Sequence, residues 1–387
     1  MSKLDDLIQQ YCPDGVEYKP LSKVCQSIKT GRLNANAMVD GGNYPFFTCS
    51  DKVYTIDSYS FDTEALLVAG NGYLGNVKYY KGRFDAYQRT YVLSNFIKEV
   101  DIMYVYYSMQ NSFREFALKS QKDGSVPYIT IGIFDNYQIP VPPLPVQEEI
   151  VRILDTFTEL QAELQAELQK RLQQYNYYRD NLLSFEGRAD VEWKKLGDVA
   201  SIKTGRRFVR TDIKESGVPC FHYGDLYTYY GLTATHTKGY LDKELASKLR
   251  FAQPNDVVVV CAGENDMDLG VGVAWLGDEP AVVHDACCIL HHNQNPRYIS
   301  HFLRTHNYHL QMKKYVKNGK ISSLPSSGLA EALIPIPSLE EQGRIATILD
   351  RFDSLTTDLT SGLPAEIEKR RQQYEYYRDK LLTFKRA

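Results

Sequence analysis

The sequence contains two copies of one segment, and this internal repeat constrains the possible folds more than any other feature. Residues 139–157 (IPVPPLPVQEEIVRILDTF) return 195 positions later as residues 334–352 (IPIPSLEEQGRIATILDRF), with 10 of 19 positions identical. Residues 173–185 (QQYNYYRDNLLSF) likewise return as residues 372–384 (QQYEYYRDKLLTF), with 10 of 13 positions identical. Repeats of about half the chain length predict a pseudo-two-fold molecule, because each half can form a similar structural unit.

Length and composition set broad limits. A chain of 387 residues is too long for one ordinary core and fits two domains with connecting elements. Apolar runs such as Val257–Cys261 are too short to span a bilayer, and the N-terminal MSKLDDLIQQ is acidic and amphipathic, unlike a signal peptide. The seven cysteines have no Cys-x-x-Cys spacing, so we expect reduced thiols and a cytoplasmic protein without membrane contact. A net charge of −3 still permits a local basic face.

A variable block precedes each copy of the repeat. The blocks cover residues 12–143 and 190–337, and both contain short β-like runs separated by glycine and asparagine turns. The runs that we expect to be strands are Ala65–Ala69, Val77–Tyr80, Thr90–Leu93 and Asp256–Cys261. Both blocks end in an Ile-Pro-x-Pro segment, which continues neither a strand nor a helix and marks a stiff boundary. We therefore predict an α+β fold with two mixed α/β domains.

A long helical pattern follows each proline boundary. In the first copy, apolar residues recur every three or four positions from Leu144 to Phe185, which corresponds to on the order of 60 Å of helix. The opposite face is polar, so the apolar stripe needs a partner, and the second copy is the evident one. The alternative is a helix packed on the core of its own domain. We place the two helical spacers at residues 144–186 and 338–385.

Three details bear on how the repeat is arranged. The second copy has extra residues at Ser361–Pro364 (SGLP), where glycine and proline should bend or break the helix. The first copy contains the tandem unit QAEL-QAEL at residues 161–168, and one such unit adds about one helical turn, or roughly 6 Å. Asp6–Ile8 align with Asn181–Leu183, so we expect residues 1–11 to form a helix that completes the second helical region in a circular arrangement.

These features together resemble the specificity subunit of type I restriction–modification systems. The resemblance rests on two divergent blocks, each followed by an Ile-Pro-[Val/Ile]-Pro…Gln…Ile…Ile-Leu-Asp-x-Phe helix that ends in Gln-Gln-Tyr-x-Tyr-Tyr-Arg-Asp-x-Leu-Leu-x-Phe, and it covers essentially the whole chain. It implies that each block is a target recognition domain that reads one half of a bipartite, asymmetric sequence in double-stranded DNA. It also implies that the conserved helices form an antiparallel coiled coil, which fixes the gap between half-sites and docks two modification subunits.

The resemblance further implies a division of labour between subunits. Adenine methylation and DNA cleavage belong to the modification and restriction subunits, so this chain is expected to have no catalytic residues and not to be an enzyme. S-adenosylmethionine, ATP and magnesium are expected on partner subunits, and no cofactor is expected on this chain. The sequence leaves open whether restriction subunits join the complex.

Several motifs resemble catalytic or cofactor sites but lack a part that such a site requires. Gly70–Gly75 matches Gly-x-Gly-x-x-Gly, but a dinucleotide site needs a helix next, and residues 76–82 are typical of a hairpin. The three histidines within residues 301–309 lack the further ligands of a closed metal site. His284 lies beside Asp285 without a nucleophile at a supporting spacing. We therefore expect neither a metal site nor a catalytic site.

Candidate DNA contacts are basic, amide, histidine and aromatic residues in loops, because such side chains reach phosphates and base edges. The Lys-Thr-Gly-Arg segments occupy equivalent places in both blocks, which favours contact with the DNA backbone. In the first block the candidates are Lys29, Arg32, Asn34, Asn71, Tyr73, Lys78, Arg83, Gln88 and Arg89. In the second block they are Lys203, Arg206, Arg207, Arg210, His222, Tyr223, Asn265, Lys317, Asn318 and Lys320. The alternative for any one of them is a solvated surface residue.

The tyrosine-rich ends of the two helices are candidate partner contacts. Some of these tyrosines should pack in the coiled coil and others should meet a modification subunit, since aromatic side chains are favoured at interfaces. The candidates for the partner interface are Tyr177, Tyr178, Tyr376 and Tyr377. Two alternatives for the whole chain stay open, namely a coiled-coil scaffold with protein-binding domains and a DNA-modifying enzyme with a cryptic site.

Overall fold

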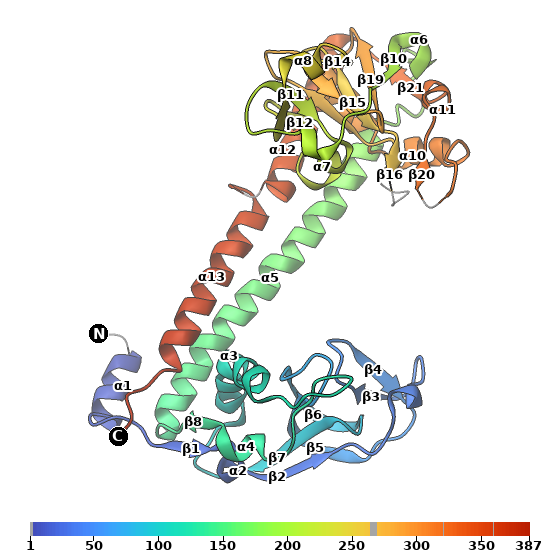
Figure 1. Ribbon diagram of the computed structural model, residues 1–387. Coiled ribbons are helices and arrows are strands. Elements are labelled where there is room, and N and C mark those ends of the chain that lie inside the picture. The colour runs from blue at the N-terminus through green and yellow to red at the C-terminus, as the bar shows by residue number, and fades with distance from the viewer. Residues whose placement is uncertain (1–2, 264–268, 320, 359) are drawn as a thin grey trace. The chain divides into compact units, whose positions relative to one another are not determined.

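The computed structural model describes residues 3–263, 269–319, 321–358 and 360–387. The chain divides into two compact units (Figure 1). Unit 1 comprises Met1–Glu163 and Glu368–Ala387, and unit 2 comprises Leu164–Ile367. Each unit therefore contains one variable block, the start of the helix that follows this block and the end of the other helical copy. Over the described ranges, no helix is long and apolar enough to cross a membrane.

Unit 1 is built on one six-stranded sheet. Its strands are β2 (Cys25–Thr30), β3 (Tyr44–Phe47), β4 (Val53–Ile56), β5 (Phe61–Ala69), β6 (Val77–Ala86) and β7 (Thr90–Phe96). Their order in the sheet is β2-β7-β5-β6-β3-β4. β5 and β6 form the longest antiparallel ladder, whereas β3 joins β6 in parallel only near Ala86. The three strands expected in the first block are confirmed as parts of β5, β6 and β7.

Helix α3 (Ile102–Ser120) and the sheet of unit 1 share one core. Leu66 and Leu93 of the sheet are fully buried in one cluster with Val105 and Phe113 of the helix. The remaining elements of unit 1 are α1 (Lys3–Tyr11), β1 (Tyr18–Pro20), α2 (Leu21–Val24), η1 (Ala35–Ala37), α4 (Ile133–Asn136) and β8 (Gln138–Pro140), with β1 paired to β8.

Unit 2 has two smaller main sheets in place of one. The first contains β10 (Ala200–Thr204), β19 (Cys287–His292), β15 (Val257–Val260), β17 (Gly272–Trp275) and β12 (Thr233–Ala234), in that order. The second contains β13 (Gly239–Leu241), β11 (Val218–Phe221), β18 (Ala281–Val283) and β14 (Phe251–Ala252), in that order. The strand expected at Asp256–Cys261 is confirmed as β15, whose valines are all buried.

An interrupted strand accounts for the two sheets of unit 2. β17 pairs with β15 in antiparallel orientation, and β18 pairs with β11 in parallel orientation. In unit 1 the single strand β6 makes both kinds of pairing, antiparallel with β5 and parallel with β3. Gly277 and Pro280 stand between β17 and β18. Proline cannot donate a ladder hydrogen bond, and a Cβ at Gly277 would lie 2.2 Å from the Trp275 ring. The strand therefore breaks in unit 2 where β6 continues in unit 1.

Apart from the long helices, the other elements of unit 2 are short. They are β9 (Glu192–Lys195), α6 (Leu196–Val199), η2 (Arg210–Asp212), α7 (Tyr223–Thr228), α8 (Lys243–Ala246), β16 (Ala262–Gly263), α9 (Pro296–Phe302), α10 (His306–Lys313), β20 (Ser322–Ser323), α11 (Ser326–Ala330) and β21 (Leu333–Ile336). β9 pairs with β21, as β1 does with β8 in unit 1, and β16 pairs with β20.

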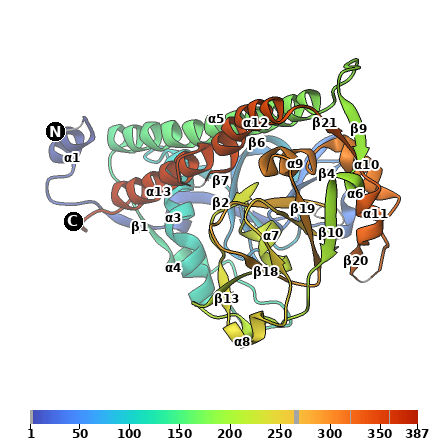
Figure 2. The same ribbon diagram turned by 90° about the horizontal axis from the view of Figure 1, so that it is seen from above.

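The first helical spacer is a single helix, α5 (Leu144–Leu182), whereas the second is divided into α12 (Leu339–Thr357) and α13 (Leu363–Leu381) (Figure 1, Figure 2). The break expected in the second copy is therefore confirmed. A Cβ at Gly362 would lie 2.6 Å from the Ser354 carbonyl oxygen, so glycine is needed where the chain passes close to the end of α12.

A buried glutamine ties the start of each helical copy to its own domain. Gln147 and Gln342 are both fully buried. The Gln147 side chain accepts a hydrogen bond from the Asp101 backbone N–H at 2.9 Å and donates one to a proline carbonyl of the boundary segment at 2.6 Å. The Gln342 side chain accepts from the Asn295 backbone N–H at 3.0 Å and donates to the matching proline carbonyl at 2.9 Å. One repeated residue thus makes the same two contacts in both units.

Each unit also holds one stacked ring pair to which both copies of the repeat contribute. In unit 1, Phe157 of α5 stacks on Tyr377 of α13, with ring centroids 5.5 Å apart. In unit 2, Phe352 of α12 stacks on Tyr178 of α5, also at 5.5 Å. The two phenylalanines are equivalent in the repeat, and so are the two tyrosines. In each unit, the start of one helical copy therefore packs against the end of the other.

Both ends of the chain lie in unit 1. Leu4 of α1 is buried in one cluster with Leu382, which follows α13. After α1, the Val16 backbone N–H donates to the Lys385 carbonyl at 2.9 Å, and the Ala387 N–H donates to the Val16 carbonyl at 3.2 Å. Helix α1 is thus a separate helix added beside the end of α13.

Candidate nucleic-acid interface

The two Lys-Thr-Gly turns end the first strand of the main sheet in each unit. A Cβ on Gly31, after β2, would lie 1.7 Å from the Ala86 carbonyl oxygen, and one on Gly205, after β10, would lie 2.2 Å from the His284 carbonyl oxygen. Only glycine permits this approach of two backbones, so both domains need it to form the turn. The predicted contacts beside the two turns are all exposed, namely Lys29, Arg32, Asn34, Lys203 and Arg206.

In unit 1, three segments meet where β5 ends. The Gly70 backbone N–H donates to the Arg89 carbonyl at 2.9 Å, and the Tyr73 N–H donates to the Cys49 carbonyl at 2.9 Å. The β5–β6 connection is thereby held against the segments that follow β3 and β6. The predicted contacts that these bonds bring together are Asn71, Tyr73, Gln88 and Arg89.

The glycine motif at Gly70–Gly75 is the loop of a hairpin, since β5 and β6 are antiparallel neighbours. A strand follows it in place of the helix that a dinucleotide site requires. The hairpin predicted at residues 76–82 is wrong. β6 passes through Lys81 and Gly82 without turning, and Gly82 adopts a φ of 132° within the strand.

A further loop is equivalent in the two units, and the sequence prediction identified it only in unit 2. Lys317 N–H donates to the Ser323 carbonyl at 2.8 Å, and Lys122 N–H donates to the Tyr128 carbonyl at 2.8 Å. The Arg89 guanidinium lies 5.5 Å from the centroid of the Tyr128 ring, so the loop of unit 1 joins the predicted contacts. Lys122 is therefore a missed candidate. The available signal was the pair of sequences Lys-Asp-Gly and Lys-Asn-Gly that begin at the two lysines.

Two predicted contacts of unit 1 already have partners within the domain. Arg83 lies at the far end of the β5–β6 ladder from the glycine loop, where its Nε donates to Asp62 at 3.0 Å and its guanidinium lies over Tyr59. Lys78 donates to the Ser50 carbonyl at 2.5 Å, and burial lowers its pKa. Lys78 thus positions the segment after β3, and Arg83 lies apart from the loop cluster.

In unit 2, four predicted contacts line one pocket of about 380 Å³, which are Arg207, Arg210, His222 and Tyr223. His284 and the buried Phe208 lie in the same pocket. The His222 ring centroid lies 4.9 Å from that of His284 and 4.7 Å from that of Tyr223. Residues more than 60 positions apart in the sequence therefore form one ring cluster in a pocket that two exposed arginines also line.

The two imidazoles of this pocket are held in their neutral form. Burial lowers the pKa of His222, and the neighbouring His284 lowers it further. Burial also lowers the pKa of His284, against a smaller opposing effect of Asp285. A neutral imidazole offers one donor and one acceptor, which suits the edge of a nucleobase better than a phosphate.

The remaining predicted contacts of unit 2 are the loop residues Lys317, Asn318, Asn265 and Lys320. Lys317 and Asn318 are exposed. Asn265 and Lys320 lie outside the described residues.

The histidines at residues 301–309 do not assemble a metal site. Throughout the described ranges, no group of three or more His, Cys, Asp or Glu could hold a metal ion. The buried His301 ring instead lies between two protein groups, with Nδ1 3.2 Å from the Tyr175 hydroxyl and Nε2 2.9 Å from an Asp350 carboxylate oxygen. His301 therefore forms part of the packing between the domain and the long helices.

The predicted partner-interface tyrosines have matching exposures in the two copies. Tyr177 is 64% exposed and its equivalent Tyr376 is 63% exposed. Tyr178 and Tyr377 are 43% and 40% exposed, and each stacks one ring face on a phenylalanine of the other copy. The remaining tyrosine of the motif, Tyr175 in the first copy, is buried. Each helix end thus offers one largely exposed tyrosine ring, which meets its neighbour edge to face, and one half-covered tyrosine ring.

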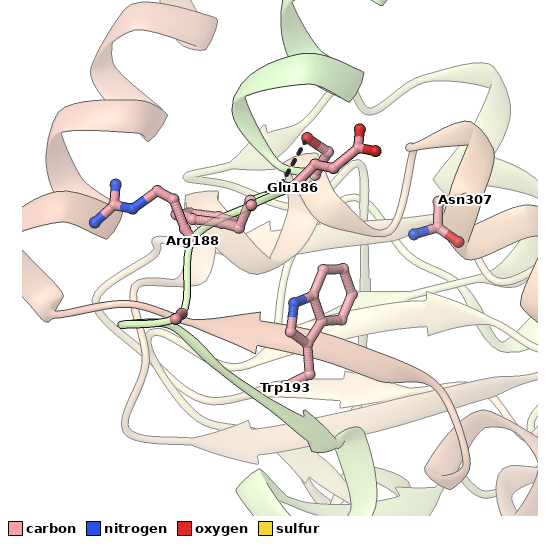
Figure 3. Close-up of a pocket in the computed structure, with 8 residues that line it drawn as sticks. Glu186, Arg188, Trp193 and Asn307 are labelled. Atoms are coloured by element: carbon pink, nitrogen blue, oxygen red, sulfur yellow. Dashed lines mark hydrogen bonds between the residues drawn. The ribbon is translucent and has the colours of Figure 1, made fainter.

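A shallow hollow of about 610 Å³ lies beside the connection between α5 and β9, lined by residues 184–189, Trp193 and Asn307 (Figure 3). Figure 3 shows Arg188 extending away from Trp193 and Asn307. The Arg188 guanidinium donates two hydrogen bonds to Asp190, and the Ser184 hydroxyl donates to a backbone carbonyl. These groups are engaged in local contacts, so the hollow forms part of the chain connection.

Comparison with known proteins identifies the family of this chain. A family model described as the type I restriction modification DNA specificity domain matches residues 13–174 and again residues 189–369. The specificity subunit of an Escherichia coli type I restriction enzyme is 35% identical over 297 residues, which cover 73% of this chain and 71% of that one. A Haemophilus influenzae chain named as a putative type I restriction enzyme specificity subunit is 29% identical over 394 residues, covering 95% and 96% of the two chains.

Solved structures share the fold. A crystal structure of a type I restriction–modification S subunit from M. genitalium superposes with a TM-score of 0.55 at 16% identity, covering 95% of this chain and 96% of that chain. A chain from a structure of the assembly and conformational transition of the type I R-M system gives a TM-score of 0.58 at 17% identity, covering 96% and 98%. Since both family-model matches together span most of the sequence, the chain belongs to the type I restriction–modification DNA specificity family.

Proposed function

We propose that this chain reads a bipartite, asymmetric DNA target, with each unit recognising one half-site. The observation that carries the proposal is a cluster of loops built on equivalent strands in both units, with different side chains in each. The shared Lys-Thr-Gly turns suit phosphate contact, which positions a protein without reading sequence. The divergent loops around Asn71 and Arg89 in unit 1, and around Arg210 and His222 in unit 2, then supply two different specificities.

The helices form the frame that separates the two readers. The reciprocal stacks of Phe157 on Tyr377 and of Phe352 on Tyr178 support an antiparallel coiled coil with pseudo-two-fold symmetry. The same arrangement explains why a helix end of one copy lies in the unit of the other. The spacing of half-sites then depends on helix length, since the helices set the distance between the readers.

Two modification subunits dock on this frame, one at each helix end. The support is the matched exposure of Tyr177 and Tyr376, because exposed aromatic rings at repeated positions suit a repeated partner. Methylation and cleavage are carried out by partner subunits, which bind S-adenosylmethionine, ATP and magnesium, and this chain acts as a non-catalytic specificity subunit.

One experiment tests the proposal directly. The chain is purified with its modification subunits, and methylated adenines are mapped across genomic DNA. A motif of two defined halves around an undefined gap supports the proposal, whereas a continuous motif contradicts it. Methylation by the chain without modification subunits would instead support a DNA-modifying enzyme. Loss of sequence-specific, salt-sensitive DNA binding would support a protein-binding scaffold.

A further inference from the structure

The ring pocket of unit 2 is recessed below the surface. Its central ring, His222, is only 9% exposed, whereas Ile321 at the rim is 61% exposed. Within the described part of the chain, no hydrogen bond to either ring nitrogen of His222 is formed. A flat base-pair edge in a groove cannot reach into such a recess, so its ligand must project from the surface of the DNA.

The charged side chains that line the pocket are exposed, whereas the rings of Phe208 and His222 are buried. Arg207 and Arg210 are exposed at the mouth, where they can bind an anion. Asp285 is exposed as well, and its carboxylate lies 3.0 Å from His284 Nδ1, so it disfavours an anion beside that ring. A group that is uncharged and aromatic, but linked to a phosphate, matches both parts of this arrangement.

Unit 1 differs at the equivalent place. The last residue of β3 accepts a hydrogen bond from the Tyr87 N–H at 2.8 Å, and the last residue of β11 accepts one from the His284 N–H at 3.1 Å. The residue that follows the strand is Thr48 in unit 1 and His222 in unit 2. A small hydroxyl side chain thus replaces the central ring, so the ring cluster is a property of unit 2.

We propose that this pocket receives one nucleobase of the second half-site after the base has swung out of the duplex. The base packs against the rings of His222, Tyr223 and His284, and the adjoining phosphates bind Arg207 and Arg210. Stacking on aromatic rings offsets part of the cost of unpairing the base. This inference rests on the proposed DNA-reading function and adds the form in which unit 2 reads one of its bases.

The test uses the complex with its modification subunits on duplexes that contain the mapped target. In each duplex, one base of the second half-site is left facing an abasic position, which lowers the cost of extruding it. When the abasic position faces the extruded base, we expect the complex to bind this duplex about tenfold more tightly than the intact duplex. The His222→Ala complex should lose this gain. His236→Ala, an exposed histidine elsewhere in unit 2, is the matched control and should keep the gain. Gains at the methylated adenines, which the modification subunits cause, should persist in both variants.

The outcomes separate this inference from the proposed function. Specific binding without any gain that depends on His222 would overturn the pocket assignment and leave the reading function intact. Absence of specific binding by the unaltered complex would overturn both. If His222→Ala lowers the melting temperature, Arg210→Gln removes a phosphate contact at the exposed mouth and should abolish the same gain. A gain that survives Arg210→Gln in full would also overturn the assignment.

Discussion

The two units agree where they meet the long helices and differ where they carry loops. Gln147 and Gln342 make equivalent buried hydrogen bonds, and the hydroxyls of Tyr104 and Tyr298 donate to equivalent proline carbonyls at 3.1 and 2.9 Å. In contrast, one sheet of unit 1 corresponds to two sheets in unit 2, and the ring pocket belongs to unit 2. The repeated residues therefore build the helical frame, and the unrepeated residues build the loops that we propose to read DNA.

One difference lies inside the frame itself. In unit 1 the Tyr107 hydroxyl donates to Asp155 at 2.6 Å, whereas in unit 2 His301 contacts the equivalent Asp350 at 2.9 Å. In unit 2, the joint between domain and helix therefore contains a histidine ring that can take up a proton. In unit 1, burial and the Asp155 contact raise the pKa of Tyr107 far above neutrality, so this hydroxyl keeps its proton. The two joints should respond differently to pH although they are geometrically equivalent.

The largest effect should follow from removing the buried glutamines. Gln147→Ala or Gln342→Ala leaves a buried N–H and a buried carbonyl without partners, at about 1–3 kcal/mol for each group. We expect the free energy of unfolding to fall by roughly 3 kcal/mol in the unit that carries the change. Native-state hydrogen exchange measures this loss separately in each unit. The exposed Gln173→Ala should leave both units unchanged. Unequal losses at the two glutamines would show that the joints are not equivalent.

A second test separates the units by pH. All eight histidines lie in unit 2. Burial lowers the pKa of five of them, His222, His284, His292, His301 and His309. Because these side chains bind protons more readily when unfolded, their stabilisation is complete above about pH 6.5 and is lost as pH falls toward the folded pKa. Each group contributes up to about 1.4 kcal/mol per pH unit.

Unfolding at about pH 7 and about pH 5.5, with proteolysis reporting on each unit, measures this effect. At the lower pH, unit 2 should lose stability because its histidines bind protons. Unit 1 contains no histidine and should not lose stability in this way. Burial of part of the Asp353 side chain raises its pKa, which opposes the trend at lower pH, so the comparison stays above the usual carboxyl range. Equal losses in the two units would contradict the assignment.

The helix-end tyrosines should give smaller and paired effects. Tyr177→Ala and Tyr376→Ala should each weaken the binding of one modification subunit by about tenfold, since truncating a central aromatic contact costs more than about 1 kcal/mol of binding free energy. Native mass spectrometry would then record a complex with one modification subunit for each single variant. Tyr229→Ala, 50% exposed but away from the long helices, should retain two. Retention of two in every variant would remove these tyrosines from the interface.

The smallest effect concerns the equivalent loop lysines. Lys122→Ala and Lys317→Ala should each weaken DNA binding to a similar extent for all sequences and reduce the salt slope by about 1, as expected for one lost phosphate contact. Titrations at several salt concentrations measure the slope. Lys170→Ala, exposed on α5, serves as the control. A changed methylation motif in either loop variant would instead assign that lysine to base reading.

The sequence was sufficient to predict the helices of the frame, because residues close together in the sequence determine where these helices form and break. Apolar spacing and repeated motifs predict α5, and Gly362 with its neighbours predicts the break between α12 and α13. The ring pocket could not be predicted, because His222 and His284 meet only through the parallel pairing of β11 with β18. Lys122 was missed for a different reason, since its repeat signal is only three residues long.

The proposed division has the repeated helices set the gap between half-sites and the divergent loops read them, and the tandem QAEL unit at residues 161–168 offers a test of it. Removing residues 165–168 shortens α5 by about one turn and nearly preserves its apolar face. The measurement is the methylation motif of this deletion variant with its modification subunits. We predict the same two half-sites separated by a shorter gap. An unchanged gap, or a change in either half-site, would contradict this division.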